Sequence, residues 1–179
     1  NNWMHGISFI TEPLAEDLLI AGYSKLVTWV SSTSKDMELH VSIRVMDGEN
    51  QVQYPIAMGE MTGHPYFPVS FGALKVSHRK TDPKLSTEYR PYHTHTKEDY
   101  QPLKPGEVVP VEVEIWPTTA LIRKGWRIRM DVQPVSGDYM TFQIWDVCDR
   151  SYQKGSTNTI YTGPNHISYL QLPVIPVKK

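Results

Sequence analysis

The stretch MELHVSIRV, from Met37 to Val45, alternates apolar and polar side chains without a break. Successive side chains of a β-strand point to opposite faces of the sheet, so this stretch would bury one face and leave the other in water. An α-helix would need apolar residues three and four positions apart, and the stretch lacks that spacing. It therefore predicts a half-buried β-strand.

The same alternation recurs along the chain and predicts an all-β protein. It is found again at residues 109–115, 126–132 and 140–144. Five shorter apolar runs predict further strands at residues 25–31, 56–61, 69–76, 158–161 and 168–172. Turn-forming pairs such as Asp47-Gly48 and Lys124-Gly125 separate these runs. Eight or nine antiparallel strands, each with one wet face, predict a β-sandwich or jelly roll of the galactose-binding-like kind.

Two segments depart from this pattern. Residues 117–122 (PTTALI) predict a turn or two of helix before Gly125. Residues 81–103 are polar and rich in Tyr, Pro and His, and they predict a long loop. A loop of that length in a compact domain is usually functional or docked on a neighbour.

Composition excludes several classes of partner and scaffold. The 179 residues carry 18 Lys and Arg against 19 Asp and Glu, and a net charge of −1 gives no general attraction to nucleic acid or to an anionic membrane. The longest apolar run is the four residues 18–21, far below the roughly 20 that a membrane span needs. The single cysteine, Cys148, cannot form an internal disulfide. With no signal-peptide pattern either, the compartment stays undetermined, with a slight preference for the cytoplasm.

No motif for autonomous catalysis is present. The chain contains no G-x-S-x-G nucleophile elbow, no phosphate-binding P-loop and no G-x-G-x-x-G dinucleotide motif. One cysteine also excludes a cysteine-based zinc finger. We therefore expect no catalytic residue and no cofactor in this chain.

His93 and His95 form the one candidate metal-binding pair. On an extended chain this spacing places both imidazoles on one side, and neutral imidazole is a good ligand for zinc or copper. Further ligands would have to come from Glu98, Asp99 or His78. The favoured interpretation is a polar loop pair that bonds to the backbone or to a neighbouring domain.

Aromatic residues suggest a second class of function. Trp29 and Trp126 follow the core pattern, whereas Trp145 is out of step with its neighbours and would face outward. An outward tryptophan can stack on a sugar ring, so a free-standing carbohydrate-binding jelly-roll module is the alternative. It can equally anchor an interface.

Charged residues on the solvent-exposed faces of two predicted strands suggest salt bridges that stabilise the fold. Glu112 and Glu114 lie on one predicted strand, and Arg127 and Arg129 lie on the next. We expect them to pair across the strands and to fix the register.

Five segments, in order, resemble the C-terminal jelly-roll domain of one group of enzymes. The group is that of the X-Pro dipeptidyl-peptidases and cocaine-esterase-like (CocE/NonD) serine hydrolases, and the resemblance runs from about Ser8 to Pro176. The matching segments are residues 13–36, 71–79 (FGALKVSHR), 89–95 (YRPYHTH), 103–129 and 168–176 (SYLQLPVIP). One departure is visible, because the family usually has Gly-His-Arg where this chain has Gly125-Trp126-Arg127.

The resemblance implies an accessory role. In that family the Ser-Asp-His triad lies on a preceding α/β-hydrolase domain with a helical cap, and none of it maps onto this chain. Residues 1–179 would then be one domain excised from a larger hydrolase of ester or amide bonds, which agrees with a chain that opens at Asn1 without an initiator Met.

The expected partner is that α/β-hydrolase domain of the same parent chain. This domain would pack on it and help to wall the active-site cleft, and an unpartnered docking face could also pair with a second copy as a homo-oligomer. The candidate contact residues, all in the predicted loop, are Tyr89, Arg90, Tyr92, His93 and His95.

Overall fold

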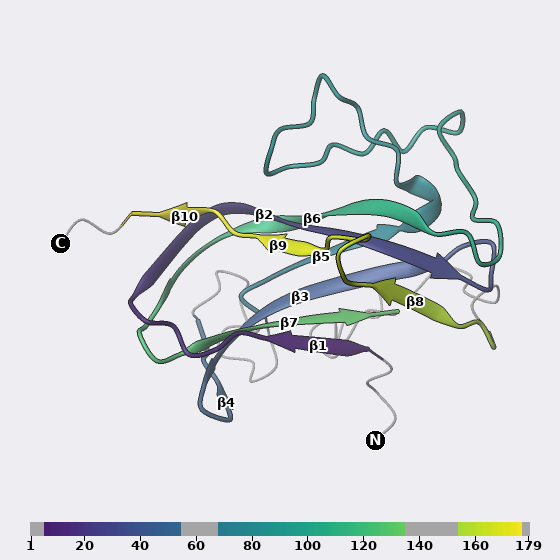
Figure 1. Cartoon of the computed structure of the whole chain (residues 1–179). Helices are drawn as coiled ribbons and strands as arrows, with labels where there is room; N and C mark the ends of the chain where they lie inside the picture. Colours follow the sequence, from purple (N-terminus) through teal and green to yellow (C-terminus); the bar gives the residue numbers. More distant parts are fainter. Residues whose placement is uncertain (1–5, 55–67, 135–153, 177–179) are drawn as a thin grey trace, which may run out of the picture.

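The computed structural model describes residues 6–54, 68–134 and 154–176 (Figure 1). These residues form two antiparallel sheets that face each other and contain no α-helix. The predicted all-β sandwich is therefore confirmed. The described residues also contain no helix long and apolar enough to cross a membrane.

Sheet A is the lower layer in Figure 1. Its strands run in the order β1 (Ile7–Ile10), β7 (Arg127–Gln133), β3 (Glu38–Asp47) and β4 (Asn50–Gln51). β5 (Ser70–Lys75) also pairs with β3, and one 3₁₀ turn, η2 (Val76–His78), follows it. The decisive stretch MELHVSIRV thus supplies the central strand of this sheet.

Sheet B is built around the longest strand, β2 (Leu18–Ser32). β6 (Val109–Ile122) pairs along one side of it. The other side carries three short strands in succession, which are β8 (Asn158–Tyr161), β9 (Tyr169–Gln171) and β10 (Val174–Ile175). The chain changes sheet five times among the described strands: from β1 to β2, β2 to β3, β5 to β6, β6 to β7 and β7 to β8.

The core lies between the sheets and follows the predicted alternation. On β3, Leu39, Val41, Ile43 and Val45 point inward and are each at most 2% exposed. The facing side chains of sheet B are Ile20, Leu26, Val30, Val111, Val113 and Ile115. The opposite face of sheet A is less wet than predicted, because Ser42 and Asp131 on it are buried as well.

The predicted helix at residues 117–122 is wrong. β6 continues without interruption to Ile122, with Ile20 opposite Ala120 on the partner strand β2. A register shift between Gly22 and Ser24 lies opposite Pro117, so the proline occupies a bulge, where its missing N–H costs no ladder bond. Pairing with a neighbouring strand therefore overrides the local sequence signal.

The other expected strands are located as follows. The run at 25–31 is part of the longer β2, the run at 69–76 is β5, and the run at 168–172 contains β9. The run at 158–161 is β8 as predicted. The runs at 56–61 and 140–144, together with Trp145 and Cys148, lie outside the described residues.

Candidate functional site

The predicted loop at residues 81–103 is confirmed, and it lies against the outer face of sheet B. Figure 1 shows it beyond η2, above β6. Arg90 Nε donates a hydrogen bond to Glu114 Oε1 of β6 at 3.0 Å, and its guanidinium lies 4.8 Å from the ring centroid of Tyr23 on β2. Hydrogen bonding and charge attraction from Glu114 raise the pKa of Arg90. A single side chain thus joins the loop to both long strands of the sheet.

The five predicted contact residues divide into two groups. Arg90 and His93 are directed onto the domain itself, whereas Tyr89 is 52% exposed and Tyr92 is 40% exposed. His95 is exposed and has φ = 50°, the only positive φ of a non-glycine residue in the described part of the chain. The loop therefore presents tyrosines outward on a backbone that the sheet holds in place.

Three histidines gather at the base of this loop. The ring centroids of His78 and His95 are 5.5 Å apart, and those of His93 and His95 are 5.7 Å apart. His93 bonds to the backbone of Glu112 on β6, and its Nε2 is buried without a hydrogen-bond partner in the described structure. The imidazoles of His93 and His95 therefore lie near each other, as the sequence predicted, and the ring of His78 lies beside that of His95.

Burial, followed by the charge of His95, lowers the pKa of both His78 and His93. Asp99, one of the further ligands expected from the sequence, bonds to Thr96. Across residues 6–54, 68–134 and 154–176, no group of three or more His, Cys, Asp or Glu side chains has an arrangement that could hold a metal ion.

The predicted cross-strand pairs between glutamates and arginines are wrong. β6 and β7 follow each other in sequence but lie in different sheets, so their charged faces point away from each other. Glu112 instead pairs with Lys25 of β2 at 3.3 Å, and Glu114 pairs with Arg90 of the loop. Which sheet a strand joins depends on the tertiary structure, so the alternation of apolar and polar residues does not predict it.

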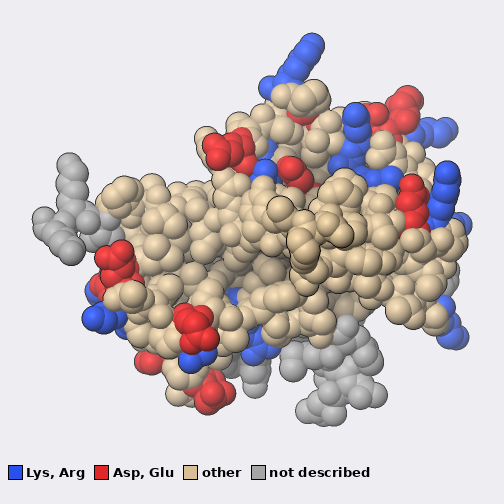
Figure 2. Space-filling model, viewed as in Figure 1, with Lys and Arg blue, Asp and Glu red and all other residues tan. Residues whose placement is uncertain are grey.

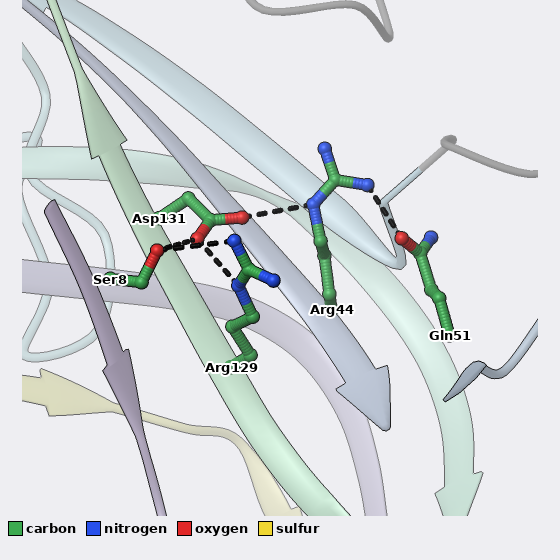
Figure 3. A network of polar contacts seen from close by, with 5 residues as sticks. All are labelled: Ser8, Arg44, Gln51, Arg129 and Asp131. Carbon is green, nitrogen blue, oxygen red and sulfur yellow. Dashed lines mark hydrogen bonds and ion pairs between the residues drawn. The ribbon is translucent and has the colours of Figure 1, made fainter. Parts of the chain in front are cut away.

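A polar network on the outer face of sheet A was not predicted (Figure 3). The Asp131 carboxylate accepts hydrogen bonds from Arg44 Nε at 3.0 Å, from Arg129 Nε at 2.7 Å and from Ser8 Oγ. Arg44 also donates to Gln51 Oε1 at 2.8 Å. The network joins β1, β7, β3 and β4, and the donors hold both oxygens of a carboxylate that is 4% exposed.

This network has the composition of a structural cluster. Ser8 Oγ donates to Asp131 and accepts from Arg129, so it joins β1 to β7. The sequence signal that could have found the cluster is the outward alternation of Arg44, Arg129 and Asp131 on neighbouring strands.

The tryptophans occupy different environments. Trp126 packs against the core, as predicted. The core assignment of Trp29 is wrong, because it lies on the outer face of sheet B, with its ring edge-on to His166 at 5.1 Å. Trp116 is 51% exposed, and its ring centroid lies 4.9 Å from that of Phe71.

The two sides of the sandwich are closed to different degrees. On one side, Gly72 of β5 lies so close to the backbone of β6 that a Cβ would collide with the carbonyl oxygen of Glu114. On the other side, β1 and β8–β9 enclose a hollow of about 240 Å³. The side chains around it are mostly apolar and include Phe9, Ile10, Met130, Ile160, Tyr169 and Leu170. We refer to it as the open-edge hollow.

The sequence is similar to a known domain over almost its whole length. A family model described as the X-Pro dipeptidyl-peptidase C-terminal non-catalytic domain matches residues 2–171. Two mycobacterial proteins that carry the name serine esterase, from Mycobacterium bovis and Mycobacterium tuberculosis, are each 26% identical over 171 residues. The match covers 94% of this chain and 24% of each relative, so the chain spans about a quarter of their length.

Solved structures give the same picture. A CocE/NonD family hydrolase from Staphylococcus aureus superimposes with a TM-score of 0.79 and 29% identity, covering 96% of this chain and 30% of that one. An α-amino acid ester hydrolase superimposes with a TM-score of 0.58 at 21% identity, which shows a shared fold alone.

Proposed function

Because the chain belongs to the family of X-Pro dipeptidyl-peptidase C-terminal non-catalytic domains, we propose that it serves as the accessory domain of a larger serine hydrolase. In this role it packs on the α/β-hydrolase domain of the same parent chain and shapes the active-site cleft. The observation that carries the proposal is a family match over residues 2–171 in a chain that spans only a quarter of its curated relatives.

The substrate class of the parent follows from the relatives. Their names describe serine esterases and a CocE/NonD family hydrolase. We assign the parent to hydrolysis of acyl ester or amide bonds by an activated serine, which requires a base within hydrogen-bond reach of the nucleophile.

The loop at residues 81–103 is one proposed contact surface with the catalytic domain. Tyr89, Tyr92 and His95 are exposed, and Arg90 and His93 bond to β6 and hold the backbone that presents them. Tyrosine is favoured at interfaces because its ring is apolar and its hydroxyl is polar. The salt bridge from Arg90 to Glu114 reduces the conformational freedom that the loop loses on docking.

A free-standing carbohydrate-binding module has one supporting observation, the exposed Trp116 beside Phe71. A sugar site needs an aromatic face together with hydrogen-bonding groups for the hydroxyls. A panel of immobilised glycans discriminates the two functions, because only the sugar-binding module would show saturable binding that Trp116→Ala abolishes.

The native size of the protein tests the accessory role. Intact mass and N-terminal sequencing of the protein from its source should give a chain far above 20.5 kDa that begins upstream of Asn1. A native chain of only these 179 residues would contradict the proposal and leave a free-standing β-sandwich.

A further inference from the structure

Among the described residues, β1 is an edge strand of sheet A, and its apolar side chains are exposed. It pairs with β7 on one side, and Ile7, Phe9 and Ile10 are 44%, 41% and 55% exposed. Phe9 lies opposite Met130, which points into the core, so Phe9 also points between the sheets. An exposed apolar edge strand is an aggregation site unless something covers it.

The open-edge hollow continues the core rather than standing apart from it. Its walls include Leu26 and Thr28 from β2, and Ile128 and Met130 from β7, all of which are buried residues. The lips are Ile10 on sheet A and Tyr169 on sheet B, the latter 48% exposed. As far as residues 6–54, 68–134 and 154–176 show, the sandwich is therefore open at this side.

Charge is scarce on this face. Figure 2 shows that Lys, Arg, Asp and Glu lie mainly around the periphery, while the middle of the face is uncharged and hollowed. At about 240 Å³ the hollow falls below the roughly 300–1,000 Å³ of typical small-molecule sites. Its size and lining suit one or two apolar side chains better than a sugar or a charged ligand.

We propose that the open-edge hollow is the seat of an apolar segment from the part of the parent chain that precedes this domain. The proposal rests on the proposed function and adds the surface and the chemistry of the contact. The segment inserts apolar side chains between β1 and β8–β9, covers the edge of β1 and completes the core at this side.

Chain connectivity favours this occupant over others. The family is that of C-terminal domains, so in a parent protein the preceding chain must enter through residues just before β1. The described chain begins at Gly6, directly before β1, and Phe9 and Ile10 of β1 line the hollow. A covalently attached segment meets the hollow at a high effective concentration, so modest apolar burial is enough to keep it in place.

Cysteine labelling of the full-length parent tests the proposal. In a background carrying Cys148→Ser, single variants Ile10→Cys and Tyr169→Cys place a thiol on each lip of the hollow. Ile175→Cys is the matched control, because Ile175 is 43% exposed on β10 and lines no part of the hollow. Leu85→Cys, at a position 55% exposed, reports separately on the loop at residues 81–103.

We expect a maleimide to label Ile10→Cys and Tyr169→Cys at least about tenfold more slowly than Ile175→Cys, because a bound segment must open before the thiols react. Equal labelling of all three thiols would overturn the inference. Protection that weakens as the protein is diluted would also overturn it, because a second copy would then be the cover.

Thermal unfolding of each variant shows whether it folds. Because Ile10→Cys and Tyr169→Cys probe the two lips independently, either one alone still tests the proposal if the other fails to fold. Failure here is distinct from failure of the proposed function. If the parent is a larger hydrolase and the thiols on the two lips react rapidly, the accessory role stands and only the assignment of the open-edge hollow as a contact surface is wrong. If the native chain has no preceding segment, the accessory role itself is wrong.

Discussion

Among single side chains, Asp131 is a buried carboxylate with two ion-pair partners. It is 4% exposed, and it accepts bonds from two guanidiniums on different strands, those of Arg44 and Arg129. Removal of one partner from a buried ionic cluster leaves uncompensated charge, which typically costs about 3–5 kcal/mol. We therefore expect Asp131→Ala to lower the free energy of unfolding by about 3 kcal/mol, toward the lower limit because Arg129 is partly solvated.

Urea unfolding measures this difference. Asp17→Ala is the matched control, because it removes a carboxylate that pairs with Arg123 on the surface, where solvent screens the charges. Asp131→Ala should lose much more stability than Asp17→Ala. Equal losses in the two variants would show that the network does not stabilise sheet A.

His93 should give the domain a pH dependence. Burial, and after it the charge of His95, lowers its pKa in the folded state below the ordinary 6.5. Below pH 6.5 the unfolded chain therefore binds more protons than the folded one, and stability falls as the pH decreases through the folded pKa. The contribution is fully present above the unfolded pKa, so the decline belongs to the acid side of about pH 6.5.

The measurement is the free energy of unfolding at about pH 7.5 and at about pH 5. His93→Gln keeps a polar side chain without a titrating group, and it should lose less stability between the two values than the unsubstituted protein. His78→Gln should act in the same direction, because burial lowers the pKa of His78 too. An unchanged decline in both variants would contradict the assignment.

Among the structural elements, the loop at residues 81–103 is joined to the outer face of sheet B by the side chain of Arg90, while backbone bonds from Gln101 to Ser77 and from Leu103 to Lys35 hold its C-terminal end. Arg90 joins it to Glu114 on β6 and to the ring of Tyr23 on β2. Arg90→Ala should therefore increase amide hydrogen exchange in the loop while the exchange of β2 and β6 stays unchanged. Lys84→Ala, at an exposed position of the same loop, is the control that should leave exchange as it is. A similar exchange in both variants would mean that other contacts hold the loop.

The strands were predictable because their information is local. Alternation at residues 37–45 and 109–115 identified β3 and the first half of β6, together with the face of each that enters the core. The helix at 117–122 was wrong because the pairing of β6 with β2 decides that segment, and pairing partners are distant in sequence. The same limit explains the wrong core assignment of Trp29. Its periodicity fits a strand, but it does not show which face of that strand the second sheet covers.

The site was predictable only in its parts. The loop and the pair His93 and His95 carry visible residue types, so the sequence could identify them. The approach of His78 and the enclosure of Asp131 result from strands that come together from distant positions. The open-edge hollow could not be predicted from any short stretch of sequence, because its lining comes from strands that are distant along the chain.

For the entire domain, one claim decides the function: this chain is the non-catalytic part of a serine hydrolase. A serine nucleophile activated by a base reacts covalently with a fluorophosphonate, and a merely exposed serine does not. Such a reagent therefore marks the catalytic serine wherever it lies in the native protein.

We would label the native protein with a fluorophosphonate and locate the adduct by peptide mass spectrometry. The account predicts one modified serine, upstream of Asn1, in a chain much larger than 20.5 kDa, with every serine of residues 1–179 unmodified. An adduct on a serine within residues 1–179, or no adduct anywhere in the native chain, would contradict it.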